Sequence, residues 1–258
     1  MAVLALYQDR GLRPDTRRLI DALRALGAYV VTVAAAGDGE TGADLALKRV
    51  NYGRDFGSYR DAILHLDRQG GLADLPRLLL MNDSVFVSGR DLDGFLGSML
   101  GIRGAAPDVL GAVDSAEIAP HLPSFAVSLG PKVLRNAAFE GFWRRFRPSD
   151  LRQTTIRKGE LALSRCLAAI APLQALHSGG GPGNPMHTNP AGLLAAGLPL
   201  IKLDGVYRGR FDTAALDRIC AALPACERQE YLALATARPP AMRTLTGWQR
   251  EAFRAGLI

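Results

Sequence analysis

The first 34 residues alternate between apolar, strand-like runs and a helix-like run, and this alternation limits the fold more than any other feature of the sequence. Val3–Tyr7 is a short apolar run, and Tyr29–Ala34 is a second one rich in β-branched residues. Between them, Pro14 opens a segment with apolar residues at helical spacing, which ends at Gly27. Two continuous apolar strands joined by a helix predict a parallel sheet that is buried on both faces.

The same alternation continues along the chain. We expect further strands near 47–50, 76–81, 107–113, 125–129 and 199–202. Helices are expected at 59–66, 91–100, 132–146, 156–170 and 191–196, and again from 211 onward with a break at Pro239–Pro240. The predicted fold is therefore α/β, with a Rossmann-like, mostly parallel central sheet and helices on both faces. We expect one α/β domain over residues 1–205 and a helical C-terminal extension over 206–258 packed on it.

Composition narrows the class of partner. The chain has 31 Lys and Arg against 25 Asp and Glu, a formal net charge of +6. We interpret this excess as scattered, without a basic arm or stripe, which disfavours nucleic acid and favours acidic small molecules or the anionic surface of the inner membrane as a peripheral contact. No apolar run approaches the roughly 20 residues of a membrane span. The N-terminus reads as a first strand and not as a signal peptide, so we expect a cytoplasmic protein.

One stretch, 49–61, contains many polar, charged and aromatic side chains between a predicted short strand and a predicted helix. Gly53 and Gly57 let the backbone approach a ligand or take positive φ. Asn51, Arg54 and Asp55 add an amide, a guanidinium and a carboxylate to a helix N-terminus, which is a suitable place for a phosphate. The alternative is an ordinary junction between a loop and a helix.

A second polar group follows a predicted buried strand directly. Asn82, Asp83 and Ser84 stand at the tip of that strand, where open α/β sheets bind their ligands. Carboxylate and amide oxygens suit a hard cation, so Asp83 is a candidate metal ligand. The alternative is an Asx turn at the strand end. Asp114 stands at the end of the next predicted strand in the same way.

Three later positions are candidates with simple structural alternatives. His121 titrates near neutrality, although a single His is more often structural. Glu160 is expected in the first turn of a helix, where the helix dipole alone would favour a carboxylate. The segment 178–190 is expected to be a loop that contains Asn184 and His187, and its glycine-rich part at 179–183 is expected to close over the donor.

Seven segments together resemble, in order, the rhamnan synthesis protein F family. They are Asn51–Gly57, Leu79–Val85, His121–Phe125, Phe142–Trp143, Gly159–Ser164, Asn184–His187 and Pro199–Lys202. The resemblance spans roughly residues 1–205. This chain departs from the family pattern at Pro123, where the family usually has glutamine, and at Met186, which replaces threonine.

The resemblance implies a glycosyltransferase of the GT-A kind that helps to build rhamnose-containing cell-surface polysaccharide. It implies a nucleotide diphosphate sugar such as dTDP-rhamnose as donor, and a glycan or lipid-linked acceptor. In this comparison Asn82–Ser84 takes the place of the usual Asp-x-Asp motif. With one aspartate in place of two, the leaving diphosphate is neutralised either by Mg²⁺ or Mn²⁺ on Asp83 or by arginines such as Arg54.

On this reading the candidate residues fall into three groups. Donor binding is assigned to Asn51, Gly53, Arg54, Asp55, Gly57, Asn82, Asp83 and Ser84. Sugar or acceptor binding is assigned to His121, Ser124, Asn184, His187 and Lys202. Glu160 is the expected proton acceptor, with Asp114 in reserve. The competing hypothesis is a binding or assembly protein of polysaccharide synthesis that keeps the fold without turnover. A nucleotide-binding oxidoreductase is disfavoured because no Gly-x-Gly-x-x-Gly follows the first strand.

Overall fold

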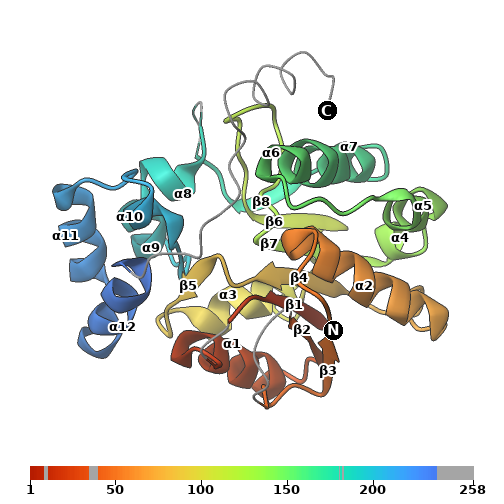
Figure 1. The fold of residues 1–258 in the computed structure, drawn as a ribbon, viewed down its shortest axis with the longest axis horizontal. Helices are drawn as coiled ribbons and strands as arrows, with labels where there is room; N and C mark the ends of the chain where they lie inside the picture. Colours follow the sequence, from red (N-terminus) through yellow and green to blue (C-terminus); the bar gives the residue numbers. More distant parts are fainter. Residues whose placement is uncertain (9–10, 35–39, 180, 182, 237–258) are drawn as a thin grey trace.

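The computed structural model describes residues 1–8, 11–34, 40–179, 181 and 183–236. Its centre is a seven-stranded sheet in the order β3-β2-β1-β4-β7-β6-β8 (Figure 1). The strands are β1 (Ala2–Leu6), β2 (Val30–Ala34), β3 (Leu45–Lys48), β4 (Leu78–Asn82), β6 (Val109–Val113), β7 (Ala126–Leu129) and β8 (Gln174–His177). β7 runs antiparallel to β4 and β6, and the other neighbours pair in parallel. The predicted α/β fold with a mostly parallel sheet is confirmed.

The inner strands β1, β4, β6 and β7 are buried on both faces of the sheet, whereas the edge strands β3 and β8 are partly exposed. In β1, Val3 and Ala5 pack into one apolar core, and Leu4 and Leu6 pack into the core on the opposite face. Successive side chains of a strand point to opposite faces, so a strand covered on both sides has no polar positions.

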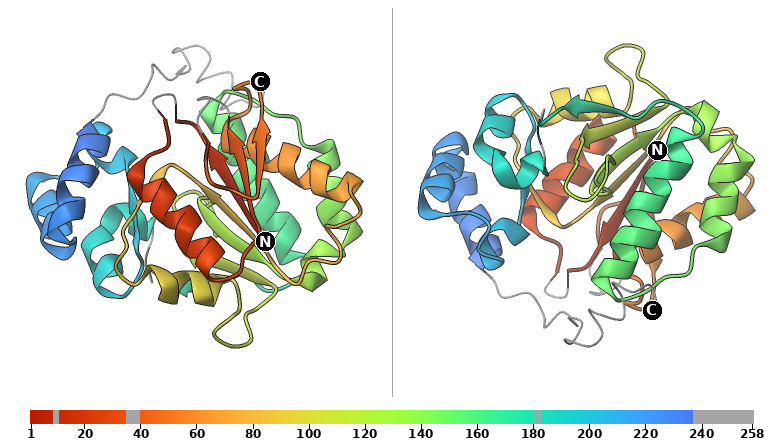
Figure 2. Two further views of the ribbon diagram at one scale, coloured as in Figure 1. Left: turned by 90° about the horizontal axis from the view of Figure 1, so that it is seen from below. Right: turned by 90° about the horizontal axis from the view of Figure 1, so that it is seen from above.

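Helices cover both faces of the sheet (Figure 2). One face is covered by α2 (Arg54–Arg68), α4 (Pro131–Leu134), α5 (Ala137–Arg145) and α7 (Leu161–Ala168). The other face is covered mainly by α1 (Pro14–Ala25) and α3 (Leu92–Met99). Among the described residues, none of the helices combines the length and the apolarity that crossing a bilayer requires.

A smaller third core lies beside the main sheet. It is built on a two-stranded antiparallel sheet of β5 (Val85–Val87) and β9 (Leu200–Lys202). Around these strands lie α8 (Pro185–Thr188), α9 (Pro190–Ala195), α10 (Asp204–Tyr207), α11 (Thr213–Ala222) and α12 (Ala225–Thr236). From α12, the buried Glu227 accepts hydrogen bonds from Ser88 Oγ at 2.6 Å and Gly89 N at 2.8 Å. The described part of the predicted C-terminal extension is therefore helical and packed, and the predicted break at Pro239–Pro240 lies outside the described residues.

Several expected elements differ in detail from the structure. The helix expected over 132–146 is two helices, because Asn136 caps a new start by accepting from the amide of Ala138. β5 and β8 were not expected, since each is only three or four residues long. The largest difference concerns Glu160. The helix expected to begin near 156 begins with α6 (Arg152–Thr154) and continues through a π-helical segment, η1 (Thr155–Glu160), into α7. Glu160 is thus inside a continuous helix, and the interpretation that it caps a first turn was wrong.

Candidate functional site

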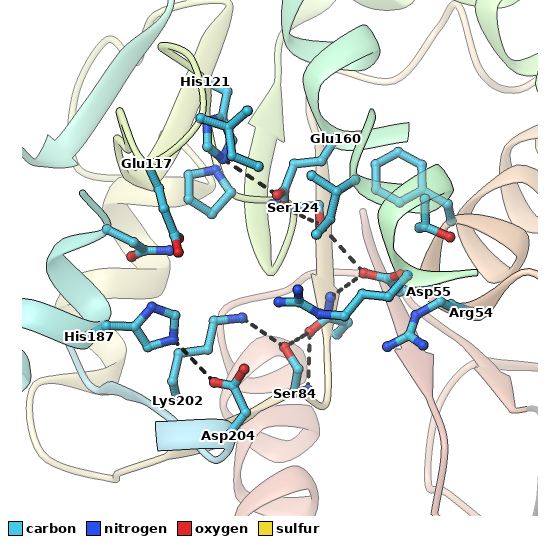
Figure 3. A pocket seen from close by; sticks show the side chains of 18 of the residues that line it. Arg54, Asp55, Ser84, Glu117, His121, Ser124, Glu160, His187, Lys202 and Asp204 are labelled. Atoms are coloured by element: carbon cyan, nitrogen blue, oxygen red, sulfur yellow. Dashed lines mark hydrogen bonds and ion pairs between the residues drawn. The ribbon is translucent and has the colours of Figure 1, made fainter. Parts of the chain in front are cut away.

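A cavity of about 190 Å³ opens at the edge of the sheet where the parallel strands end (Figure 3). Asn82 reaches it from the end of β4 and Lys202 from the end of β9, while α2 and η1 supply its other walls. Of the residues predicted for the site, ten line this cavity: Arg54, Asp55, Asn82, Ser84, His121, Ser124, Glu160, Asn184, His187 and Lys202. The structure therefore brings these ten residues, which come from distant segments of the chain, together around one cavity.

Two carboxylates in the cavity share one serine. Glu160 Oε2 accepts from the backbone amide of Ser124 at 2.7 Å and from its hydroxyl at 2.8 Å. The same hydroxyl lies 3.4 Å from Asp55 Oδ2, which also accepts from Asn82 Nδ2 at 2.8 Å. Tyr59, fully buried beneath them, donates to the carbonyl of Ser124 at 2.9 Å. Asp55 and Glu160 are thus held on either side of Ser124 by fixed donors (Figure 3).

Glu160 also pairs with His121, which reaches it from the loop after β6. The distance from His121 Nε2 to Glu160 Oε1 is 3.4 Å, and the other ring nitrogen is 2.7 Å from the carbonyl of Ala119. Burial opposes the charged form of each group. The hydrogen bonds and the opposite charges outweigh it, so the pKa of Glu160 is lowered and the pKa of His121 is raised. Glu160 is therefore ionised at neutral pH.

Asp55 is in a different electrostatic situation. Burial raises its pKa, and the neighbouring charge of Glu160 raises it further, against the opposing effects of Arg54 and Lys202. Two nearby carboxyl groups whose environments drive their pKa values apart are a common arrangement in sites of proton transfer.

The same cavity also carries positive charge. Neither Arg54 nor Arg152 has a hydrogen-bond or ion-pair partner among the described residues, and both line the cavity. Burial lowers the pKa of Arg152, and the nearby guanidinium groups of Arg208 and Arg54 lower it further, against the attraction of Asp204. Lys202 Nζ donates to Ser84 Oγ at 3.1 Å and lies 4.6 Å from the centre of the Phe125 ring. Two guanidinium groups without protein partners in one cavity are suited to binding an oxyanion.

The backbone at the start of α2 is strained where it presents Arg54. Gly53 has φ of +83°, and a Cβ there would collide with the side chain of Pro148. The next residue, Arg54, has φ of 57°, although it is not glycine. The amide of Gly53 donates to Asp150 Oδ1 at 2.7 Å, which holds this turn against the loop after α5. Such backbone conformations cost on the order of 1–3 kcal/mol and tend to occur at functional sites.

A second group of ion pairs closes one side of the cavity. Arg210 lies 3.2 Å from Glu117 Oε1 and 3.1 Å from His187 Nδ1. On its other side, His187 Nε2 lies 3.2 Å from Asp204 Oδ1. These contacts join the loop after β6 to α8 and α10, so the cavity is closed by residues from both the main sheet and the smaller core.

Five predicted residues do not line the cavity. Asn51, Gly53 and Gly57 lie in the adjacent turn, where Gly57 leaves room for the carbonyl of Tyr52, 2.5 Å from where a Cβ would be. Asp83 Oδ2 accepts from the amide of Tyr7 at 2.6 Å. Asp114 accepts from Ser178 Oγ at 2.8 Å and from the amide of Gly179 at 3.1 Å. Of the glycine-rich loop expected to close over a ligand, Gly180 and Pro182 lie outside the described residues.

The residues around Asp83 do not fit a cation held by the protein. Within the described ranges, no group of three His, Cys, Asp or Glu side chains is arranged to hold a metal ion. Asp83 faces the side chain of Arg13, whose Nη1 donates to the carbonyl of Asp83 at 2.9 Å. We therefore assign no step of the chemistry to a metal ion on Asp83.

No family model matches the chain. It is 30% identical over 177 residues to the uncharacterized protein y4gN of Sinorhizobium fredii (strain NBRC 101917 / NGR234). The matched part is 64% of this chain and 45% of that protein, so the chain spans less than half the length of this curated relative.

Two solved structures share parts of the architecture at low similarity. A glycosyltransferase involved in the glycosylation of the major capsid of PBCV-1 is 12% identical with a TM-score of 0.45, over 81% of this chain and 97% of that one. A hypothetical transferase from Thermus thermophilus is 17% identical with a TM-score of 0.34, over 64% of this chain and 77% of that one. The resemblance to the rhamnan synthesis protein F family stays a prediction made from the motifs.

Four charged residues of the cavity were not predicted from the sequence. They are Glu117, Arg152, Asp204 and Arg208. Arg152 stands four residues before the Ile156 at which the helix was expected to begin, so a correct helix start would have placed it one or two turns from Glu160. Asp204 follows the strand-end Lys202 by two residues, which is a signal of the kind used for Asn82–Ser84. Nothing in the local sequence distinguishes Glu117 or Arg208 from other surface charges.

Proposed function

We propose that the protein is a glycosyltransferase that moves a sugar from a nucleotide diphosphate sugar to the hydroxyl group of an acceptor. The observation that carries this proposal is the presence of two features in one cavity. Arg54 and Arg152, which have no partner among the described residues, line the same cavity as the Asp55–Ser124–Glu160 network. Sugar transfer needs both features, because the leaving diphosphate must be stabilised while the acceptor hydroxyl loses a proton.

The arginines and Lys202 are assigned to the diphosphate. A guanidinium binds phosphate oxygens through two parallel hydrogen bonds, and a diphosphate would relieve the repulsion among Arg54, Arg152 and Arg208. The charge that develops on the leaving group is then balanced by groups already in place, so no reorganisation free energy is needed during the reaction.

Glu160 is assigned the role of accepting the proton of the acceptor hydroxyl. Its lowered pKa keeps it ionised at neutral pH, as a proton acceptor must be. Asp55 and Ser124 are assigned to the hydroxyl groups of the transferred sugar, and His121 keeps the Glu160 carboxylate oriented. Asp114 is not needed in this scheme, since it does not line the cavity.

The identities of the sugar, the donor and the acceptor rest on the motif resemblance. The resemblance implies a deoxyhexose such as rhamnose, a dTDP-rhamnose-like donor, and a cell-surface polysaccharide or lipid-linked glycan as acceptor. The cavity volume of about 190 Å³ is below the roughly 300 Å³ at which pockets for drug-sized ligands begin. It therefore suits the sugar and its nearest phosphate, with the nucleoside bound outside it.

The test is release of nucleoside diphosphate from a panel of nucleotide sugars, measured with and without a glycan acceptor. Acceptor-dependent release by the wild type, abolished in Glu160→Gln, supports the proposal. Glu40→Gln, an exposed change that does not line the cavity, is the control for a lost carboxylate. Equal turnover by Glu160→Gln and the wild type would remove Glu160 from its role.

A second candidate is a protein that binds the nucleotide sugar without turnover. It is favoured by the engagement of both carboxylate oxygens of Glu160, one by Ser124 and the other by His121. Calorimetry with nucleoside diphosphates separates the two candidates. Binding without turnover of any donor identifies the binding protein, and absence of binding excludes both.

A further inference from the structure

The excess positive charge of the chain is concentrated in one segment. Of 31 basic and 25 acidic residues, nine and three lie between residues 131 and 168, which leaves 22 of each in the rest. The segment thus carries a net charge of +6, equal to that of the whole chain. The interpretation of the excess as scattered was wrong for this segment.

The fold brings these charges to one side of the molecule. The segment forms α5, η1 and α7, and α5 packs beside α7 on the same face of the sheet (Figures 1 and 2). Cys166 of α7 contacts α5 directly, since its Sγ donates to the carbonyl of Ala138 at 3.5 Å. We define the basic face as five exposed basic side chains of this layer: Arg145, Arg147, Arg157, Lys158 and Arg165.

The charges of this face are largely unneutralised. Arg145, Arg147, Lys158 and Arg165 have no carboxylate within ion-pair distance among the described residues. Arg144, by contrast, pairs with Asp67 at 2.8 Å and with Glu140 at 2.6 Å. Beyond Arg144, an open surface hollow between α2 and α5 adds Arg60 and Arg68. Basic side chains therefore continue onto α2, although Arg60 lies 3.7 Å from Asp61.

We propose that the basic face binds the surface of an anionic membrane. Clusters of roughly four to eight Lys and Arg bind anionic lipid headgroups, and each contributes on the order of 1 kcal/mol. The partner follows from charge complementarity and from the position of η1. This segment directs Glu160 into the cavity while Arg157 and Lys158 are exposed. A membrane against the face would lie next to the cavity, where a lipid-linked acceptor would be presented, and this last step rests on the proposed function.

The test is sedimentation of the full chain with vesicles of phosphatidylcholine alone or mixed with phosphatidylglycerol. We expect binding only to the mixed vesicles, and weaker binding as salt is raised. The quadruple variant Arg145→Gln, Arg147→Gln, Lys158→Gln, Arg165→Gln should lose about fivefold in vesicle affinity per charge removed, on the order of 600-fold in total. Circular dichroism would verify that the variant is folded.

The matched control removes the same number of exposed charges elsewhere, through Arg17→Gln, Arg90→Gln, Arg103→Gln and Arg218→Gln. An equal loss in both variants would mean that only net charge matters and would overturn the assignment of the face. Tighter binding to a DNA or RNA duplex than to mixed vesicles would overturn the membrane as partner. Vesicle binding needs no turnover, so its failure leaves sugar transfer to a soluble acceptor intact, and failed transfer leaves vesicle binding intact.

Discussion

Gly159 lies against the ring of Phe56, where a Cβ would come within 2.9 Å of Cγ and 3.0 Å of both Cδ atoms. Phe56 directly follows Asp55, and Gly159 directly precedes Glu160. The contact therefore sets how closely the two segments that carry the carboxylates approach each other. Gly159 and Glu160 both lie in the π-helical segment η1. Such segments are rare and occur frequently at functional sites.

The Gly159→Ala variant should be less stable than the wild type by about 1–3 kcal/mol, the usual cost of overpacking a core. Alanine favours a helix over glycine by about 1 kcal/mol. The cost of overpacking should exceed this gain in helix propensity, because the Phe56 ring cannot easily move. It is packed against the rings of Trp143 and Phe146, with centroids 5.9 and 5.6 Å away. Urea unfolding measures the difference. The control is Gly94→Ala in α3, where the nearest atom to a new Cβ is the end of an arginine side chain at 3.6 Å. That variant should gain stability, and a similar gain in Gly159→Ala would contradict the prediction.

The Glu160–His121 pair should make stability depend on pH. The pKa of His121 is raised, so its contribution is complete below the unfolded value of about 6.5 and is lost as pH rises through the folded value. The pKa of Glu160 is lowered, so its contribution is present above about 4.5 and is lost as pH falls through the folded value. The cost of Glu160→Gln, about 1–2 kcal/mol, should be greatest between these limits.

Nuclear magnetic resonance titration of the His121 ring checks the same pair directly. The pKa of His121 should fall in Glu160→Gln, because the carboxylate that raises it is gone while the burial that lowers it remains. His177 lies outside the cavity and serves as the internal control. An unchanged His121 titration would show that the two residues do not interact in solution.

Much of this fold follows from local sequence patterns. β1, β2 and β4 are continuous apolar runs that only a doubly covered sheet can bury, and their parallel pairing follows from the helices between them. The antiparallel direction of β7 depends on how a long loop returns through His121 to Ser124, and no local pattern records that. β5 and β8 owe their pairing to partners far along the chain.

The same contrast holds for the site. Asn82 was predicted because strand ends gather at one edge of a parallel sheet, and Ser124 was predicted from the motif resemblance. The direction of a side chain at such an edge is set by its neighbours. Asp83, next to Asn82, turns away because the amide of Tyr7 and Arg13 provide its partners. Arg152 was missed because its place in the cavity depends on a π-helical segment, which sequence periodicity does not reveal.

Asp55→Asn and Glu160→Gln should differ in their kinetic effects. Asn at 55 keeps a hydrogen-bonding group towards the sugar and removes the charge that opposes Glu160, so KM should change more than kcat. Gln at 160 cannot accept a proton, so kcat should fall about 10²–10⁴-fold with donor affinity retained. Steady-state kinetics with saturating donor separates the two. The reverse pattern would assign proton acceptance to Asp55.

Arg152→Gln should weaken binding of a nucleoside diphosphate by about 10- to 100-fold, since a hydrogen bond to a charged group contributes about 1.5–3 kcal/mol. Without ligand the variant should be at least as stable as the wild type. Arg152 has no described partner to lose, and its removal relieves repulsion from Arg208 and Arg54. Calorimetry gives the affinity and urea unfolding gives the stability, with Arg17→Gln as the control. A loss of stability equal to the loss of affinity would instead mean that Arg152 supports the fold, and the diphosphate would then need a different site.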